Sequence, residues 1–386
     1  MNVFKRGILF ITCFILFNFI FLSCNSDEPE YIGEGDKNNL VLIYAVAANN
    51  LQYNLDSDMN EILTAAPQLD LINNKVLVYY VKKDAICQLT ELVYNKEKAT
   101  YEFKEIGPEF RDLPLSTSVE RIREVIEYVD ENYDYSHMGL ILWSHATGWI
   151  PWFGGSTPRR AFGRDEYDNN VYQTNITDLA EAIPEGIFDY IWFDCCYMAN
   201  IETLYELKDK APVIVGSVLE VPADGMPYHL TMPYLVNGTT NLKGAAQAFF
   251  DYYNEMDSRY IAASISIVNT SELQRLAEVC RYIFFTGGKP NLSIGIQNYS
   301  RLSGSPFYDM EQLLDSYTTL TVEDAVLLAH AMDNAVVFKL ITDHDFNGKF
   351  IDTKKYSGLS IHNYNDANND VENYYKELSW FKVTRN

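Results

Sequence analysis

Continuous apolar runs of strand length alternate with amphipathic helical patterns along this chain, and this alternation constrains the fold most. The runs contain few polar residues, as strands buried on both faces do. They span residues 39–48, 75–81, 138–144, 188–193 and 213–218. Helical spacing of apolar residues lies between them, at 51–66, 119–129, 177–183 and 198–208. Strands separated by helices predict an α/β fold, with helices on both faces of a mainly parallel central sheet.

The second half of the chain continues this mixture without a fixed-period repeat or a linker. Helical patterns lie at 242–256, 271–285 and 322–338, and strand patterns at 264–268 and 358–362. Thr117–Glu120 matches a capping box, which predicts the start of a helix. Residues 151–170 show neither the helical nor the strand period of apolar residues, and they are rich in Gly, Pro and charged groups. This composition predicts an exposed loop. We therefore expect one continuous domain over residues 38–386.

The charge of the chain argues against one class of partner. It carries 53 acidic and 30 basic residues, a formal net charge of −23. Proteins bind nucleic acids largely by replacing phosphate counterions with Lys and Arg. The acidic balance therefore argues against a nucleic-acid partner, and it is compatible with cationic substrates.

Residues 1–23 have the pattern of a bacterial export signal. Two basic residues precede an apolar run over residues 7–22, which is slightly short of a bilayer-spanning helix. A single membrane anchor is the alternative interpretation of this run. The run ends in Leu22-Ser23-Cys24, which resembles a lipobox and predicts that Cys24 becomes the acylated first residue. Residues 24–37 then form a flexible acidic tether, and we expect an outer-membrane or cell-surface lipoprotein anchored through its N-terminal lipid.

Cysteine usage after the signal argues against two kinds of structural site. Four cysteines remain beyond Cys24, which is too few for a disulfide scaffold in a chain of this length. None has the Cys-x-x-Cys spacing of a structural zinc site. These cysteines are Cys87, Cys195, Cys196 and Cys280.

Two of the predicted strands end in reactive residues. The strand at 138–144 leads to His145, and the strand at 188–193 leads to Asp194, Cys195 and Cys196. Ligands of open parallel sheets bind beyond the carboxyl ends of the strands. If the two strands are neighbours, an imidazole lies beside a thiol there and favours the nucleophilic thiolate. Taken singly, each residue also fits a structural role, as a buried thiol or a core histidine.

The residues around both positions resemble the histidine and cysteine motifs of the clostripain family, in the caspase-like clan of cysteine peptidases. These motifs are Trp143–Trp149 and Asp194–Met198. Cys196 follows His145 by 51 positions, close to the caspase spacing of roughly 50. Four further segments match the family's opening turn, post-cysteine helix, substrate-side loop and late core strand. They are Asn49–Leu51, Ile201–Leu207, Ser217–Tyr228 and Gly358–Ile361.

The resemblance implies a caspase-like three-layer sandwich and a cysteine endopeptidase with a Cys-His dyad. The motif register makes Cys196 the nucleophile and His145 its partner, through an acyl-enzyme. Adjacent residues leaving a strand point to opposite sides, so Cys195 is expected to be a small buried residue. The family's oxyanion hole uses the main-chain N–H after the histidine, here Ala146 where Gly is usual. Ala can donate in the same way if its φ is negative.

The resemblance also implies cleavage of protein or peptide substrates after Arg or Lys. Asp194 matches the acid of the cysteine motif, and Asp224 lies in the substrate-side segment. A buried carboxylate there would form charge-assisted bonds with a cationic side chain. The alternatives are a helix cap for Asp194 and an ordinary turn residue for Asp224.

Self-cleavage and calcium dependence are two further properties that the resemblance implies. Related precursors are often cut between the two motifs, and residues 151–170 carry Arg159 and Arg160 as candidate sites. Calcium supports some family members, while no organic cofactor is expected. Residues 343–348 look like the start of a calcium loop, but Lys354 stands where an EF-hand has its closing Glu, so a polar turn is expected.

Two other functions remain compatible with the sequence. A catalytically lapsed, surface-exposed binding lipoprotein of the same fold is one, and Ala146 is the feature that favours it. Another acyl transfer on the same dyad, such as peptide ligation, is the other.

Overall fold

The computed structural model describes residues 38–83, 87–111, 113–150, 161–238, 240–256, 258, 261–299, 307–365, 367 and 369–386. The predicted signal and tether, with Cys24, lie outside the described residues, and so does segment 151–160 with Arg159 and Arg160. Among the residues described, no helix is long and apolar enough to cross a membrane.

A nine-stranded sheet runs through the molecule in the order β12-β10-β9-β8-β5-β1-β2-β3-β4. The strands are β1 (Asn39–Ala47), β2 (Lys75–Lys82), β3 (Cys87–Asn95), β4 (Thr100–Phe110), β5 (His137–Trp143), β8 (Tyr190–Asp194), β9 (Val213–Gly216), β10 (Ser264–Asn269) and β12 (Val336–Ile341). The central strands from β9 to β2 pair in parallel, and the strands at both edges pair antiparallel. The predicted α/β fold with a mainly parallel central sheet is confirmed.

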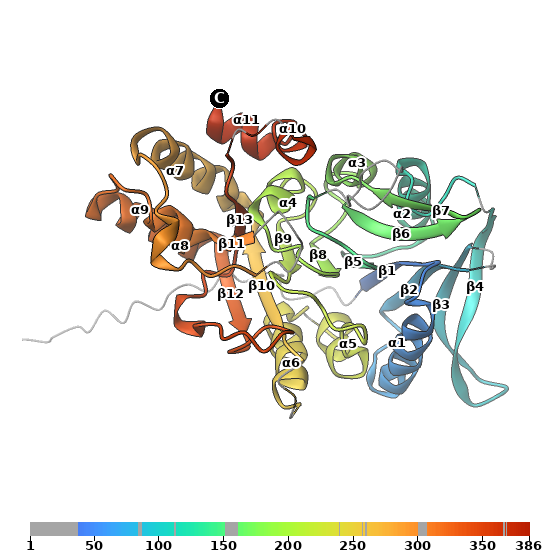
Figure 1. Cartoon of the computed structure of the whole chain (residues 1–386). Helices are drawn as coiled ribbons and strands as arrows, with labels where there is room; N and C mark the ends of the chain where they lie inside the picture. Colours follow the sequence, from blue (N-terminus) through green and yellow to red (C-terminus); the bar gives the residue numbers. More distant parts are fainter. Residues whose placement is uncertain are drawn as a thin grey trace, which may run out of the picture.

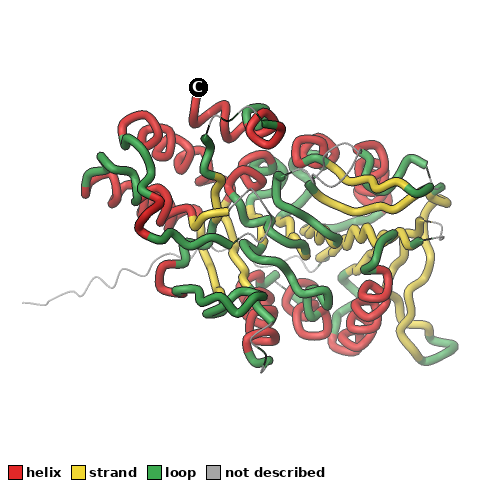
Figure 2. The backbone as a smooth tube through the Cα atoms, viewed as in Figure 1, coloured by secondary structure: helices red, strands yellow, loops and turns green. Residues whose placement is uncertain are grey.

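Helices cover both faces of the sheet and complete three layers (Figures 1 and 2). One face carries α1 (Gln52–Ala65), α5 (Tyr228–Val236) and α6 (Leu242–Asn254). The other carries α2 (Val119–Asn132), α3 (Ile176–Ala182), α4 (Ile201–Glu206), α7 (Leu273–Thr286), α8 (Met310–Asp315), α9 (Val322–Ala335), α10 (Asp370–Tyr375) and α11 (Ser379–Arg385). All nine residues of β1 are buried between these layers. Burial on both faces explains why the strand is continuously apolar instead of alternating.

Residues 162–174 form a β-hairpin, which corrects the loop prediction for the described part of segment 151–170, residues 162–170. Strands β6 (Phe162–Tyr167) and β7 (Asn170–Thr174) pair antiparallel. Asp168 and Asn169 connect them with φ of 48° and 61°, the conformation that two-residue hairpin turns require and that Asp and Asn tolerate. The Glu166 N–H donates to Ala48 O at 2.8 Å. The hairpin therefore packs beside the end of β1 instead of extending into solvent.

Three other predicted elements differ in detail from the structure. The helix expected over 322–338 ends at Ala335, and the chain continues directly as the edge strand β12. The cap of α2 is Ser118 and not Thr117, because Ser118 Oγ accepts the Arg121 N–H at 3.1 Å. The strand expected near 358–362 forms as β13 (Ser360–His362), but it pairs with β11 (Phe307–Asp309) in a separate sheet.

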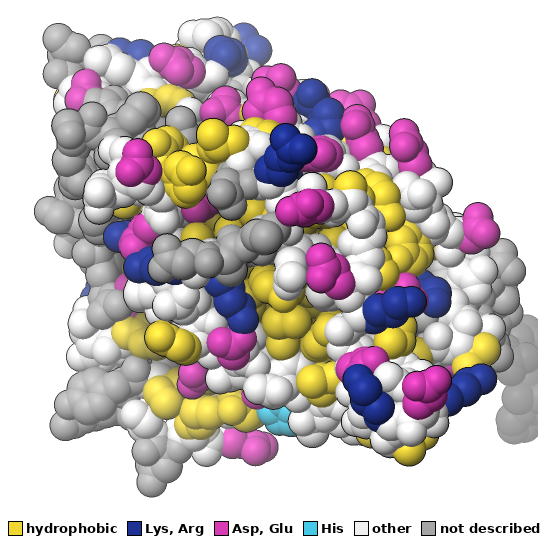
Figure 3. Space-filling view, turned by 90° about the vertical axis from the view of Figure 1, so that its right-hand side faces the viewer, with side chains coloured by type: hydrophobic (Ala, Val, Ile, Leu, Met, Phe, Trp, Pro, Cys, Tyr) yellow, Lys and Arg dark blue, Asp and Glu magenta, His cyan; other side chains and the backbone are white. Residues whose placement is uncertain are grey.

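The surface at the β4 end of the molecule mixes charges of both signs. Acidic and basic side chains are interspersed there among apolar ones (Figure 3). On this face, the charge is not gathered into a single field of one sign.

Candidate active site

Two neighbouring parallel strands bring the predicted catalytic residues to the same edge of the sheet. β5 pairs with β8, with Trp143 opposite Asp194. His145 and Cys196 each lie two residues beyond the end of their strand. Both side chains line one cavity of about 270 Å³, whose other walls include Phe346 and residues of the segment after β9. The structure thus brings together the imidazole and the thiol that the sequence predicted.

Cys196 lies in a turn that is held against the segment after β9. The Tyr197 N–H donates to Leu219 O at 3.0 Å, and the Val221 N–H lies 3.4 Å from Cys196 Sγ. Tyr197 has a φ of 62°, a left-handed conformation that costs a non-glycine residue about 1–2 kcal/mol. Such strain clusters at functional sites. The turn leaves the Cys196 thiol half-buried at the cavity wall.

The neighbouring thiol has a different environment. Cys195 is 1% exposed, and its Sγ donates to Leu142 O at 2.9 Å. Burial raises the pKa of the Cys195 thiol well above its usual value. A thiol held in this protonated form is a poor nucleophile. The structure therefore agrees with the expectation that Cys195 is a buried small residue.

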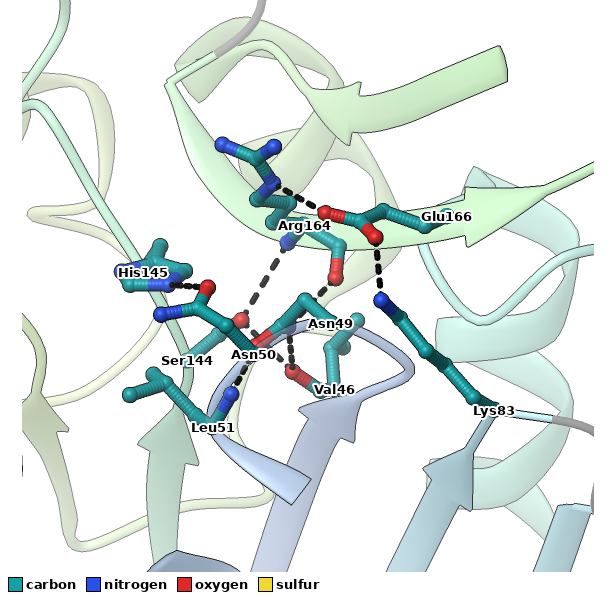
Figure 4. A network of polar contacts seen from close by, with 9 residues as sticks. All are labelled: Val46, Asn49, Asn50, Leu51, Lys83, Ser144, His145, Arg164 and Glu166. Atoms are coloured by element: carbon teal, nitrogen blue, oxygen red, sulfur yellow. Dashed lines mark hydrogen bonds and ion pairs between the residues drawn. The ribbon is translucent and has the colours of Figure 1, made fainter. Parts of the chain in front are cut away.

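An asparagine orients the imidazole of His145. Asn50 Oδ1 lies 2.8 Å from His145 Nε2 (Figure 4). Because an amide oxygen can only accept, Nε2 carries the proton of the neutral ring and Nδ1 is its unprotonated nitrogen. Asn50 thus selects the tautomer and fixes the ring plane.

A buried neighbour fixes the turn that carries Asn50. Asn49 is fully buried, and its side-chain amide donates to Val46 O at 3.0 Å and to Arg164 O at 2.6 Å (Figure 4). Its Oδ1 accepts the Leu51 N–H at 2.8 Å. These bonds tie the end of β1 to the β6 strand, so the position of Asn50 depends on the hairpin that sequence patterns missed.

Charged groups on the hairpin act on His145. Burial lowers the pKa of His145, the Arg164 guanidinium lowers it further, and Glu166 opposes the effect. Arg164 Nε lies 2.9 Å from Glu166 Oε1, and Lys83 Nζ lies 2.6 Å from Glu166 Oε2 (Figure 4). The lowered pKa favours a neutral imidazole, which can accept a proton from a thiol.

The chain after His145 is firmly anchored. Ala146 is not among the described residues with positive φ, so its N–H meets the condition for an oxyanion donor. The Thr147 N–H donates to Ala161 O at 3.0 Å. Trp149 is fully buried, with its ring centroid 5.3 Å from that of His362 and 5.1 Å from that of Tyr375. This aromatic anchor limits the movement of the Ala146 main chain.

The two predicted specificity acids have different positions. Asp194 is 5% exposed and lines the cavity, where its Oδ2 accepts the Met226 N–H at 3.0 Å and the Tyr228 hydroxyl at 3.1 Å. Burial raises the pKa of Asp194 to about 6, and these two donors oppose the rise. Asp224 is exposed outside the cavity wall, 3.4 Å from Asn54 Nδ2. The helix-cap alternative for Asp194 fails, because the cap of α4 is Asn200.

The 343–348 segment forms a turn. Asp345 Oδ1 accepts the main-chain N–H groups of Asn347 at 2.8 Å and Lys349 at 2.9 Å. Across the described ranges, no three His, Cys, Asp or Glu side chains group in a way that could hold a metal ion. The turn instead places Phe346 at the cavity.

Comparison with known families identifies this arrangement. A sequence model described as "Clostripain family" matches residues 43–334, which is most of the chain. The chain belongs to the clostripain family. It is a cysteine endopeptidase, with peptides and proteins as its substrate class. A search among curated proteins found no match.

Solved clostripain-family structures resemble this one over nearly their whole length. A secreted C11 cysteine protease from Bacteroides thetaiotaomicron, bound to an irreversible peptide inhibitor, has 26% identity and a TM-score of 0.77. The match covers 91% of this chain and 99% of that one. An inactive zymogen C11 protease from Parabacteroides distasonis has 26% identity and a TM-score of 0.75, over 92% and 99% of the two chains. The shared fold is the caspase-like sandwich that the sequence predicted.

Sequence reasoning left two polar residues near the cavity without a role. Asn50 follows β1 just as His145 follows β5, so the strand-end argument could have included it. Asp58 lies on the buried face of α1 together with Leu55 and Ile62. An acid at an apolar position of a helix was the available signal.

Proposed function

We propose that this clostripain-family chain hydrolyses peptide bonds after Arg or Lys, with Cys196 as nucleophile and His145 as acid–base partner. The observation that carries the proposal is the convergence of Cys196, His145 and the buried Asp194 on one cavity. At this cavity the thiol can attack the peptide carbonyl, the imidazole can transfer protons, and the carboxylate can recognise a cationic side chain.

The chemistry begins with proton transfer from the Cys196 thiol to the unprotonated nitrogen of neutral His145. The thiolate attacks the peptide carbonyl, and the Ala146 N–H donates to the oxyanion that forms. The His145 imidazolium then protonates the leaving amine as the C–N bond breaks. A water molecule, deprotonated by His145, hydrolyses the resulting thioester and restores the thiol. The Asn50 bond supports this sequence by stabilising the imidazolium and its orientation.

The position of Asp194 supports the proposed specificity for Arg or Lys. The carboxylate lies at the cavity wall, next to the strand end that carries Cys196, and is held by two donors on its Oδ2. A cationic P1 side chain (the one preceding the scissile bond) would form charge-assisted bonds with it. Asp224 lies outside the wall, so we assign the recognition role to Asp194.

A panel of fluorogenic peptides tests this specificity. Substrates that differ only in a P1 Arg, Lys, citrulline or norleucine are compared by kcat/KM. We expect the two cationic peptides to be cleaved and the neutral ones to be poor, with Asp194→Asn reducing the difference by about 10-fold or more. Equal rates for Arg and citrulline would contradict the specificity.

Self-cleavage after Arg159 or Arg160 is part of the proposal. Trp149 and Phe162, on either side of segment 151–160, are both fully buried. Since β5 and β8 are paired in the sheet, two cut chains would stay associated. Mass spectrometry of the wild type against Cys196→Ala tests this step: a fully active wild type that remains one uncut chain contradicts it.

Export as a lipoprotein rests on the N-terminal pattern and on the description of a similar protein as secreted. We propose acylation at Cys24 and an outer-membrane or cell-surface location. The mature protein should partition into detergent, and Cys24→Ser should release or mislocalise it. An intact Met1 on the membrane-bound protein would instead support a signal anchor. Calcium dependence stays a prediction, tested by activity after EGTA dialysis and calcium return.

A further inference from the structure

An aromatic side chain that the proposed chemistry does not use lines the active-site cavity. Phe346 is half-buried and borders the cavity together with Val221 and Pro222 of the segment after β9. It packs against a buried apolar cluster that includes Val218 and Leu219. These side chains form an apolar wall in a cavity that also holds the Asp194 carboxylate and the catalytic pair.

The turn that carries Phe346 is tied to the chain that enters β10. The Thr342 N–H donates to Ala263 O at 3.0 Å, and His344 Nε2 lies 3.1 Å from Ile261 O. Main-chain N–H groups inside the turn are bonded as well. The ring is therefore carried by a fixed support, as a side chain that selects a ligand needs to be.

The strand order sets the side of Cys196 on which Phe346 lies. Phe346 follows β12, Cys196 follows β8 and His145 follows β5, and the sheet runs in the order β12-β10-β9-β8-β5. Strands β12 and β9 run in the same direction, because both pair antiparallel with β10. All three residues thus lie at the same edge of the sheet, with Cys196 between Phe346 and His145.

This order assigns Phe346 to the part of the substrate that precedes the scissile bond. In the proposed mechanism His145 protonates the leaving amine, so the residues after the scissile bond lie toward His145. The residues before it lie on the other side of Cys196, which is the side of Phe346.

The P1 side chain and Phe346 use different walls. Asp194, the proposed P1 partner, is bonded to Met226 and Tyr228, which belong to the apolar cluster on the α1, α5 and α6 face. Phe346 packs against a separate cluster. Successive side chains of an extended peptide point to opposite sides, so the residue before P1, called P2, points away from the Asp194 wall.

We propose that Phe346 is a specificity-determining residue that binds an apolar P2 side chain, with Val221 and Pro222 completing the subsite. The inference rests on the proposed roles of Cys196 and His145, and it adds a second recognised residue to the P1 cation. A leucine or phenylalanine at P2 removes apolar surface from water against this wall, which favours its binding. Because Glu220 also lines the cavity, the test includes a basic P2 residue.

The first experiment varies P2 alone. Aminocoumarin amides with Arg at P1 and Leu, Phe, Gly or Lys at P2 are compared by kcat/KM. These substrates have no residue after the scissile bond, so any preference belongs to the acyl side. We expect the Leu and Phe peptides to exceed the Gly and Lys peptides by about tenfold or more. Equal rates for Leu and Gly, or a preference for Lys, overturn the inference.

The second experiment assigns the preference to Phe346. Phe346→Ala should lower the P2 Leu-to-Gly ratio to less than about threefold and leave the P1 Arg-to-citrulline ratio unchanged. Phe350→Ala is the matched control, because Phe350 is close in sequence but 74% exposed and outside the cavity wall; it should change neither ratio. Phe346→Gln keeps a side chain of similar length and should lower the P2 ratio in the same way, which covers the case in which alanine unfolds the turn.

The outcomes separate this inference from the proposed function. If the peptides are cleaved without regard to P2, or if the P2 ratio survives in both Phe346 variants, the inference fails alone. If the wild type does not distinguish Arg from citrulline, the P1 specificity fails, and the P2 panel with citrulline at P1 still tests Phe346. A protein that cleaves none of these peptides contradicts both proposals.

Discussion

Replacing Asn50 tests whether orientation of the imidazole contributes to the rate. Asn50→Ala removes the 2.8 Å contact to His145 Nε2. A hydrogen bond to a charged partner contributes about 1.5–3 kcal/mol, and His145 is charged once it has accepted the thiol proton. Because Asn50 is exposed in the free enzyme, we take the lower end, about 1.5 kcal/mol, which corresponds to roughly tenfold in rate.

The assay is steady-state hydrolysis of an arginyl substrate, normalised by active-site titration. Asn50→Ala should lower kcat about tenfold with KM nearly unchanged, because Asn50 acts through His145 and lies outside the cavity wall. Asn60→Ala, an exposed change on α1, is the matched control. Asn50→Asp keeps the acceptor and adds an anion, so the acid limb of its pH profile should move to higher pH. A kcat within about twofold of the wild type for Asn50→Ala would refute the reasoning.

The charges on the β6 strand should move the acid limb of kcat/KM in opposite directions. Arg164→Gln removes a cation that lowers the pKa of His145, so the imidazole protonates at higher pH and the limb moves up. Glu166→Gln removes the opposing anion and should move it down; equal shifts in one direction would contradict this electrostatic account. Trp149→Ala deletes a fully buried ring beside the Ala146 segment and should cost about 3–5 kcal/mol of unfolding free energy. Urea denaturation measures this cost, and a loss below about 1 kcal/mol would show that Trp149 is not the anchor.

The sheet and the two reactive residues were predictable because both depend on local sequence. Buried parallel strands are recognisable as short apolar runs, and β1, β5 and β8 lie within a few residues of their predicted bounds. His145 and Cys196 follow such runs directly, and their motifs are contiguous in the chain. Once β5 and β8 pair, both residues lie at the same edge of the sheet.

The residues that were missed depend on contacts between distant segments. Asn50 and His145 are 95 positions apart, and their contact requires the β1–β5 register together with the buried Asn49. The β6–β7 hairpin was hidden because its charged residues obscure the strand period. Asp224 fits the motif but faces solvent, whereas Asp58 gave no motif signal and lies beside Asp194. Burial of polar groups across elements is a tertiary property that local patterns do not encode.

Covalent labelling of the nucleophile tests the central claim most directly. An arginyl acyloxymethyl ketone is incubated with the wild type, Cys195→Ala and Cys196→Ala, and adducts are located by intact mass and peptide mapping. We expect one adduct on Cys196 in the wild type and in Cys195→Ala, and none in Cys196→Ala, because Cys195 is buried and donates to Leu142 O. An adduct on Cys195, or labelling that persists in Cys196→Ala, would contradict the account.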